Sequence, residues 1–375
     1  MALFADLPLS TQERMNSIGQ ERSLAAGECL INQDDVDHIL YLVESGELGG
    51  TKNNKIFRLQ PVDVVGEVAC LDHRPRTATV TALTPCTVLA FERETALAQF
   101  CAAPSDLQTL ISRLASLQAS RLNDEAAQDR RSPAQCVDDL AQEALQHRAV
   151  NHAYLNAMAT GAFPSLHGAL ADFAQNYYGY SAHFPRYLTA LISKLEKHEH
   201  RKALLENLTE ESGQYKEEEL LELKKCGVQP EWIIGIPHPE LFKLFRNAIG
   251  VGNTAAVDDH IEVVCWREQF LAILNTGSAA EALGVLGLGT ETIVQTIYQP
   301  FVDAINKLGS LQPEDAVFFP LHTAVDDHHQ ATLKAIASDF AATAEGRADL
   351  AKGMRKALAL RDSFWSWLHE RAMAA

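Results

Sequence analysis

The sequence lacks the features that mark secreted, membrane-spanning and thiolate-metal proteins. Its seven cysteines are odd in number and scattered, and no Cys-x-x-Cys pair occurs. Neither a disulfide framework nor a thiolate zinc site is indicated, and we expect free thiols. No apolar run reaches the ~18 residues that a membrane-spanning helix needs. The opening stretch MALFADLPLSTQERM lacks both the basic first region and the apolar second region of a signal peptide. We therefore expect a cytoplasmic protein without a membrane partner.

Positive charge is also scarce. The chain has 32 Lys and Arg residues against 49 Asp and Glu residues, which gives a formal net charge of −17. A field of this sign opposes non-specific binding to nucleic acid, so we expect no nucleic-acid partner, although a local basic pocket stays possible. Apolar residues make up 47% and charged residues 22%, which is ordinary for a globular protein. A length of 375 residues predicts two domains.

The pattern of the sequence changes along the chain. Between residues 23 and 91, short β-favouring runs such as HILYLV, KIFRL and CTVLAF alternate with turn residues, which predicts a small antiparallel barrel or sandwich. Helical spacing takes over at 93–122. The polar stretch NDEAAQDRRSPAQ, residues 123–135, is the predicted linker. Long amphipathic segments then fill residues 136–375, which predicts an all-α domain.

The most specific stretch of the first half is GEVACLDHRPRTATV, residues 66–80. A glycine turn at Gly66 leads into a short apolar helix beginning near Glu67, and exposed amides at a helix start attract anions. Arg76 adds a charged fork that suits a phosphate group. Glu67 accepts hydrogen bonds only, so it suits a sugar hydroxyl. Alternatively, Glu67 and Arg76 form a structural ion pair in a domain that binds nothing.

This stretch resembles the phosphate-binding cassette of cyclic-nucleotide-binding domains, and the resemblance extends over about residues 3–122. It implies an all-β jelly-roll barrel with flanking helices at residues 1–122 and a regulatory ligand, cAMP or cGMP. By the family's pattern Glu67 binds the ribose 2′-hydroxyl and Arg76 the cyclic phosphate, while Thr77 resembles a threonine associated with guanine recognition. The cassette amides implied to surround the phosphate belong to Gly66, Val68 and Ala69. The sequence departs from the pattern at Val62 and Gln33, where glycines are common, and at Val65, where an aromatic residue is usual.

The second half contains HTAVDDHH, residues 322–329. On one continuous helix, His322, Asp326 and His329 share a face, whereas His328 points elsewhere. Two imidazoles and a carboxylate make half a site for iron or manganese. An exposed polar helix face is the alternative. A ferritin-like site would show Glu-x-x-His pairs, and the chain has none.

Further candidate ligands lie elsewhere in this half. Glu291 opens the apolar helix ETIVQTIYQPF after the glycine-rich stretch GVLGLGT, which we interpret as a turn. Glu211 lies at the end of an amphipathic segment, in ENLTEESG. His238 begins the helix in HPELFKLF.

Taken together in this order, the residues resemble the heme-oxygenase-like diiron oxidase and oxygenase family, over about residues 145–345. The resemblance implies an all-α heme-oxygenase-like bundle that binds two irons, or a manganese–iron pair, and uses O2 on a small organic substrate; we also expect a homodimer. The implied ligands, which would also be the catalytic residues, are Glu211, His238, Glu291, His322, Asp326 and His329. An insertion between Glu211 and His238 leaves Glu210 open as an alternative to Glu211.

Two further expectations concern the chemistry. Because Thr290 precedes Glu291 and Phe318 precedes His322, we expect no tyrosine that serves as co-substrate near the metal. The aromatic residues of YYGYSAHFPRYL, residues 177–188, are expected mainly in the core. The predicted function is a cyclic-nucleotide-regulated non-heme diiron oxidoreductase. The alternative is a cyclic-nucleotide-responsive protein whose helical domain binds a ligand or partner without turnover.

Overall fold

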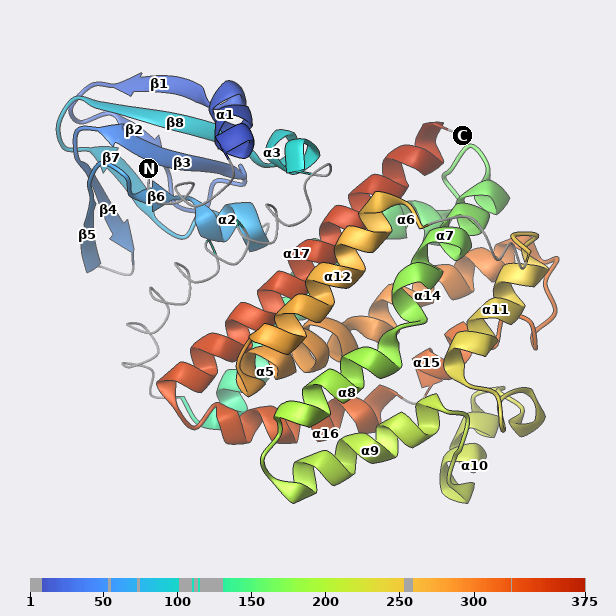
Figure 1. Cartoon of the computed structure of the whole chain (residues 1–375). Coiled ribbons are helices and arrows are strands. Elements are labelled where there is room, and N and C mark those ends of the chain that lie inside the picture. Colours follow the sequence, from blue (N-terminus) through green and yellow to red (C-terminus); the bar gives the residue numbers. More distant parts are fainter. Residues whose placement is uncertain are drawn as a thin grey trace. The chain divides into compact units, whose positions relative to one another are not determined.

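The computed structural model describes residues 9–52, 55–72, 75–100, 110, 114, 131–252, 259–324 and 326–374. The chain divides into two compact units, Met1–Leu122 and Asn123–Ala375 (Figure 1). Among the described residues, no helix combines the length and the apolar character that crossing a membrane requires.

The first unit is built around two four-stranded antiparallel sheets. One sheet has the strand order β1-β8-β3-β6 and the other β2-β7-β4-β5. The described elements are α1 (Leu9–Ile18), β1 (Gln20–Leu24), β2 (Cys29–Ile31), β3 (Ile39–Ser45), β4 (Leu48–Lys52), β5 (Lys55–Leu59), β6 (Val64–Val65), α2 (Glu67–Asp72), β7 (Thr79–Ala82), β8 (Cys86–Glu92) and α3 (Arg93–Phe100). The predicted all-β fold with flanking helices is confirmed.

Strand β3 has both of its faces buried, which places it at the centre of this unit. Tyr41 and Val43 belong to the core cluster that also contains residues from the second sheet. Leu40 and Leu42 belong instead to a second cluster, which includes Met15 of α1. Because side chains alternate between the faces of a strand, the run ILYLV supplies both cores at once.

The second unit consists of helices, as predicted. Its described elements are α5 (Pro133–Gln146), α6 (Ala153–Thr160), α7 (Leu166–Ser181), α8 (Phe184–Lys194), α9 (His198–Glu211), α10 (Glu217–Lys225), η1 (Pro230–Trp232), α11 (His238–Ala248), α12 (Ile261–Thr276), α13 (Ala279–Leu283), η2 (Gly284–Glu291), α14 (Thr292–Leu308), α15 (Phe318–Ala324), α16 (Asp326–Phe340) and α17 (Ala344–Ala374). Ser132 caps α5 and exchanges two hydrogen bonds with Gln135. Helix α5 therefore takes in the last three residues of the predicted linker.

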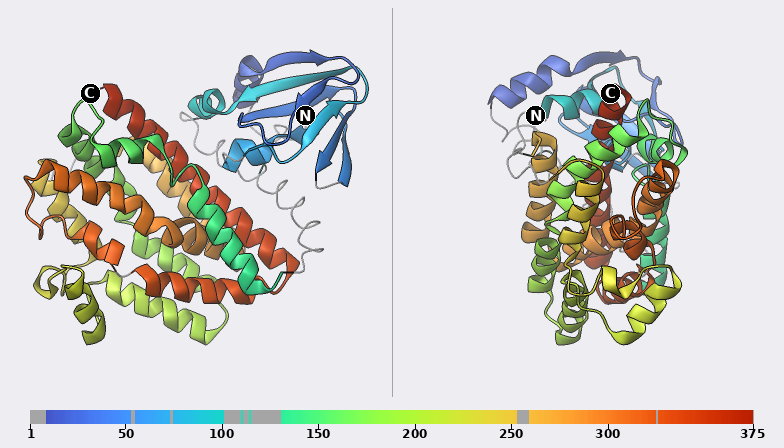
Figure 2. Two further views of the ribbon diagram at one scale, coloured as in Figure 1. Left: turned by 180° about the vertical axis from the view of Figure 1, so that it is seen from behind. Right: turned by 90° about the vertical axis from the view of Figure 1, so that its right-hand side faces the viewer.

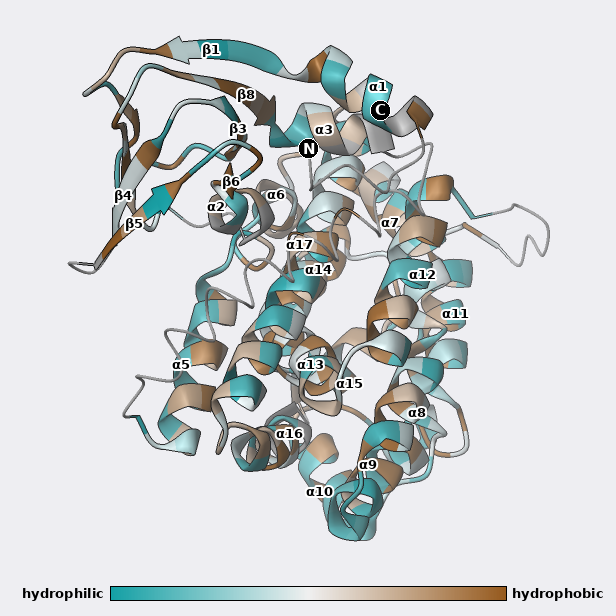
Figure 3. Cartoon of the chain, turned by 60° about the vertical axis from the view of Figure 1, so that its left-hand side comes forward, coloured by the Kyte–Doolittle hydropathy of each residue, from teal (hydrophilic) through white to brown (hydrophobic). Residues whose placement is uncertain are grey.

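The long helix α17 organises the second unit. It spans 31 residues and packs against α12, α13 and η2. Its course beside α12 can be followed in Figures 1 and 2. Hydrophobic and hydrophilic residues alternate around the helices, as expected of amphipathic segments that bury one face (Figure 3). Trp365 is fully buried, and its indole nitrogen donates to the carbonyl of Ala149 at 3.1 Å.

The stretch GVLGLGT was interpreted as a turn, and this was wrong. Residues 284–291 form a π-helix that continues from α13 and leads into α14. Its glycines allow close packing against α17: a Cβ on Gly284 would lie 2.2 Å from the carbonyl oxygen of Leu350, and one on Gly289 would lie 2.7 Å from the Cβ of Ala357. The glycines therefore serve close helix packing. A π-helix inside a helical run is rare and is often found at functional sites.

Candidate functional site

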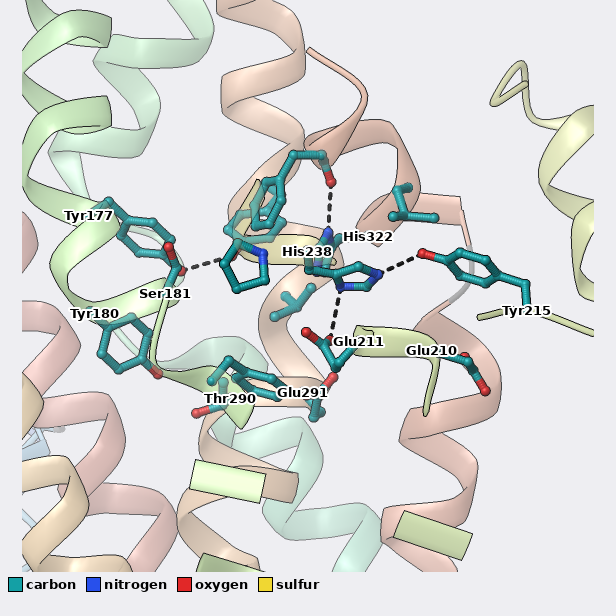
Figure 4. Close-up of a pocket in the computed structure, with 16 residues that line it drawn as sticks. Tyr177, Tyr180, Ser181, Glu210, Glu211, Tyr215, His238, Thr290, Glu291 and His322 are labelled. Carbon is teal, nitrogen blue, oxygen red and sulfur yellow. Dashed lines mark hydrogen bonds and ion pairs between the residues drawn. The ribbon is translucent and has the colours of Figure 1, made fainter. Parts of the chain in front are cut away.

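A pocket in the second unit gathers most of the candidate residues (Figure 4). The empty space in and in front of this pocket, including some that is open to solvent, is about 770 Å³. The lining residues are Tyr177, Tyr180, Ser181, Phe184, Glu210, Glu211, Tyr215, His238, Pro239, Thr290, Glu291, Val294, Tyr298, Phe318, Leu321 and His322. Four of the six predicted ligands are among them.

Three predicted ligands form a tight cluster. Glu211 ends α9, His238 begins α11 and His322 lies in α15. Each offers one ligand atom, and these atoms lie within 4.8 Å of one another. The two histidine rings have their centroids 4.8 Å apart. Residues from three separate helices thus converge on one point.

The tautomer of His322 follows from its hydrogen bond. Its Nδ1 lies 2.7 Å from the carbonyl oxygen of Phe318. Since a carbonyl can only accept, Nδ1 carries the hydrogen in the neutral ring, and the lone pair of the ring lies on Nε2. The imidazole is therefore prepared to bind a metal through Nε2.

His238 is held from both sides. Its Nε2 lies 2.8 Å from the hydroxyl of Tyr215, and its Nδ1 lies 3.0 Å from Oε1 of Glu211. Although that second distance is short, Nδ1 is buried and makes no hydrogen bond of acceptable geometry. The two atoms form an ion pair if the ring is protonated, and they are also close enough to bind one cation together when the ring is neutral. The nitrogen and oxygen donors of this cluster fit iron.

Glu291 and Glu210 occupy different positions in the pocket. Glu291 is the last residue of the π-helix, and its side chain is buried in the pocket wall. Figure 4 shows the carboxylate of Glu211 directed at His238, whereas that of Glu210 lies farther away. Of the two glutamates left open, Glu211 is the one whose oxygen joins the cluster.

Asp326 and His329 belong to α16 by backbone, but their side chains lie outside what the structure describes. The prediction that they share a face with His322 assumed one helix. The structure assigns residues 318–324 to α15 and residues 326–340 to α16. The placement of these two side chains stays a prediction.

Several tyrosines line the pocket. Tyr177, Tyr180, Tyr215 and Tyr298 all line it. They come from α7, α14 and the segment before α10. That no tyrosine serves as co-substrate stays a prediction. Phe184 also lines the pocket. Three aromatic residues of the stretch 177–188 therefore reach the pocket: Tyr177, Tyr180 and Phe184.

The candidate nucleotide site of the first unit has the predicted local structure. Gly66 adopts a φ of +94°, and α2 begins at Glu67. A Cβ on residue 66 would lie 2.4 Å from Nη1 of Arg76, so only glycine fits between the turn and the guanidinium. Val62, where the family has glycine, also takes a positive φ of 78°, a strained conformation for a β-branched residue.

Arg76 is fully buried and pairs with Asp37, not with a described glutamate. Its Nε donates to Asp37 at 3.1 Å, and its Nη2 bonds the same carboxylate and, at 2.7 Å, the carbonyl of Ile39. Nη1 has no hydrogen-bond partner. Burial alone would raise the pKa of Asp37, but the bond and charge of Arg76 hold this pKa below its ordinary value. The buried Nη1 is a free donor for an anion, which fits a cyclic phosphate.

The other cassette residues are placed as follows. Glu67 is buried at the start of α2, and Ala69 is buried within it. Val68 lies in α2, with its side chain outside the description, and Thr77 is half-buried just before β7. The backbone thus supplies a helix start beside Arg76.

Two family models match the sequence. The model described as "Iron-containing redox enzyme" matches residues 171–362, just over half of the chain. The model described as "Cyclic nucleotide-binding domain" matches residues 21–103.

Among curated relatives, a cAMP-dependent protein kinase regulatory subunit of Yarrowia lipolytica is 36% identical over 77 residues, which are 20% of this chain and 20% of that protein. A cGMP-dependent protein kinase of Drosophila melanogaster is 37% identical over 70 residues, which are 18% of this chain and 6% of that protein. The chain thus spans a fifth or less of the length of these relatives.

Solved structures also match parts of the chain. The N-terminal domain of a transcriptional regulator from Streptomyces coelicolor A3(2) has 27% identity and a TM-score of 0.28, covering 31% of this chain and 87% of that one. The catabolite activator protein of Thermus thermophilus has 26% identity and a TM-score of 0.31, and the match covers 43% of this chain and 72% of that one. Scores this low support no conclusion of their own. The family-model matches do: the chain belongs to the iron-containing redox enzyme family, and it carries a cyclic nucleotide-binding domain ahead of that enzyme domain.

Proposed function

We propose that this protein is a non-heme diiron oxidoreductase that uses O2 to oxidise a small organic substrate under control of a cyclic nucleotide. The observation that carries the proposal is the cluster of buried Glu211 and His238 with half-buried His322, whose ligand atoms lie within 4.8 Å of one another. Glu291 lines the same pocket and would add a carboxylate. Asp326 and His329 would complete the set of six.

The role of each group follows from its chemistry. Bound iron would supply the redox chemistry with O2, which amino-acid side chains do not provide. Glu211 and Glu291 would balance its charge, His238 would bind through Nδ1, and His322 would bind through Nε2. Phe318 and Leu321 would limit the access of water to the centre.

The nucleotide would act through the first unit. Arg76, with its unpaired Nη1, would anchor the cyclic phosphate of cAMP or cGMP, and Glu67 would accept from the ribose hydroxyl. Regulation requires the nucleotide to bind the active and inactive arrangements with different affinity. A coupling free energy of ~1–3 kcal/mol changes the ratio of the two arrangements about 5- to 150-fold.

Iron binding tests the proposal directly. Purified protein is loaded with ferrous iron without air, and the metal is counted per chain. We expect close to two irons, with most of the metal lost in His322→Ala and Glu211→Gln. The exposed His198 lies at the start of α9, the helix that Glu211 ends, and His198→Ala should keep the metal. Equal loss in all three variants, or no iron in the parent protein, contradicts the site.

Oxygen consumption tests the regulation. Iron-loaded protein is assayed with and without saturating cAMP or cGMP, beside Arg76→Ala. We expect a change of rate on nucleotide addition that Arg76→Ala abolishes. Iron binding without any O2 consumption would favour the non-catalytic alternative, and identical rates throughout would remove the regulatory role.

A further inference from the structure

Arg361 is a buried cation in α17 without an ion pair among the residues that the structure describes. It is 1% exposed, and its Nε makes no hydrogen bond. The neighbouring Asp362 pairs instead with Arg148, at 3.2 Å. The rings of Tyr180 and Trp266 face the guanidinium, with centroids 5.5 and 5.3 Å from its central carbon. Ring faces offset only part of the cost of burying a charge, so this position favours a nearby anion.

Two tyrosine hydroxyls connect Arg361 to the pocket. Its Nη1 lies 3.4 Å from the hydroxyl of Tyr177, and its Nη2 lies 3.3 Å from that of Tyr180. Arginine only donates, so both tyrosine oxygens accept from it. The hydroxyl of Tyr177 in turn lies 2.9 Å from that of Tyr298. Either hydroxyl can donate in this pair. When Tyr177 donates, the hydrogen of Tyr298 is available to another acceptor, and the charge of Arg361 favours this order because it polarises the Tyr177 hydroxyl.

A second donor lies on the same side of the pocket. Ser181 follows Tyr177 by one helical turn in α7, and it lines the pocket. Its hydroxyl oxygen is buried and makes no hydrogen bond. Figure 4 shows Tyr177, Tyr180 and Ser181 together, on the side of the pocket opposite Tyr215. This side thus presents hydroxyl groups backed by a positive charge.

We propose that the hydroxyls of Tyr298 and Ser181 bind the carboxylate of an organic acid substrate, with Arg361 supplying the positive charge through Tyr177. One cation and two hydroxyl donors match the single charge and the two oxygens of a carboxylate. The apolar wall at Phe184 and Val294 would take the hydrocarbon part. This inference rests on the proposed function, because it names the substrate class of the same pocket.

The test compares hexanoate with hexanamide, which has nearly the same shape and no charge. Binding to the full-length protein is measured by ligand-observed NMR titration, first with iron removed by a chelator and then with iron bound. We expect hexanoate to bind about tenfold more tightly, since hydrogen bonds to a charged group exceed neutral ones by roughly that factor. Tyr298→Phe and Ser181→Ala should each remove most of this preference, as should Arg361→Met if that variant folds.

Tyr154→Phe is the matched control, because Tyr154 is fully buried, its hydroxyl makes no hydrogen bond, and it does not line the pocket. The Tyr154→Phe variant should keep the preference for hexanoate over hexanamide. Equal binding of the two probes overturns the inference, and so does a preference that Tyr298→Phe and Ser181→Ala leave unchanged. A preference seen only with iron and insensitive to these variants would place the carboxylate on the metal. A protein that prefers hexanoate but binds no iron would keep this inference and contradict the oxidase.

Discussion

The hydroxyl of Tyr215 lies 2.8 Å from Nε2 of His238, on the side of the imidazole away from Glu211. If Nδ1 binds iron, Nε2 carries the hydrogen and donates it to Tyr215, which fixes the ring. Tyr215→Phe should therefore lower the iron affinity about 10- to 100-fold, as losses of this kind do at other metal sites. Competition with a chelating dye measures the affinity. Tyr154→Phe serves again as control, and an unchanged affinity in Tyr215→Phe would mean that the tyrosine does not orient the ligand.

The π-helix offers a matched pair of glycine substitutions. A Cβ at Gly289 would lie 2.7 Å from Ala357 Cβ and 2.9 Å from the carbonyl of Met354, whereas one at Gly287 would meet its nearest neighbour at 3.4 Å. Gly289→Ala should cost ~1–3 kcal/mol through overpacking, and Gly287→Ala should be nearly neutral or stabilising. Thermal unfolding measures both. Similar melting temperatures for the two variants would contradict the close packing of η2 on α17.

Arg76 and Gly66 should both be needed for nucleotide binding. Arg76→Ala removes a charged donor from the phosphate, and the loss of such a contact costs ~2–5 kcal/mol, or about thirtyfold in affinity or more. Gly66→Ala places a methyl group 2.4 Å from Nη1 of Arg76 at a φ of +94°, so it should also weaken binding. Calorimetry with cAMP and with cGMP gives the affinities. If the parent protein binds neither at millimolar concentration, the domain has lost its ligand.

The ion pair of Asp37 and Arg76 predicts a pH dependence. The pKa of Asp37 in the folded protein lies below its ordinary value of 3.8. The stability from this pair is therefore fully present above that ordinary value and is lost as the pH falls through the lowered pKa. Asp37→Asn should melt at a lower temperature than the parent at neutral pH, and the difference should narrow in acid. Glu44→Gln, an exposed carboxyl on β3, should show no such trend. A difference that is constant with pH would contradict the argument.

The sequence by itself determined the two kinds of domain and the local form of the nucleotide cassette. Short apolar runs such as ILYLV specify strands, and residues 66–72 specify a turn followed by a helix start, because both depend on neighbours in the chain. The order of Glu211, His238, Glu291 and His322 was also visible in the sequence, and all four reach one pocket.

Only the tertiary structure decided which groups surround those ligands. Tyr215 meets His238, and Arg361 meets Tyr177 across 184 positions of the chain, through helix packing that no local pattern encodes. The glycines of residues 284–291 read locally as a turn, because glycine favours turns. They lie instead in a π-helix, where α17 leaves no room for a Cβ at Gly284 or Gly289. The conformational preference of single residues is overridden where close packing against another helix contributes more free energy.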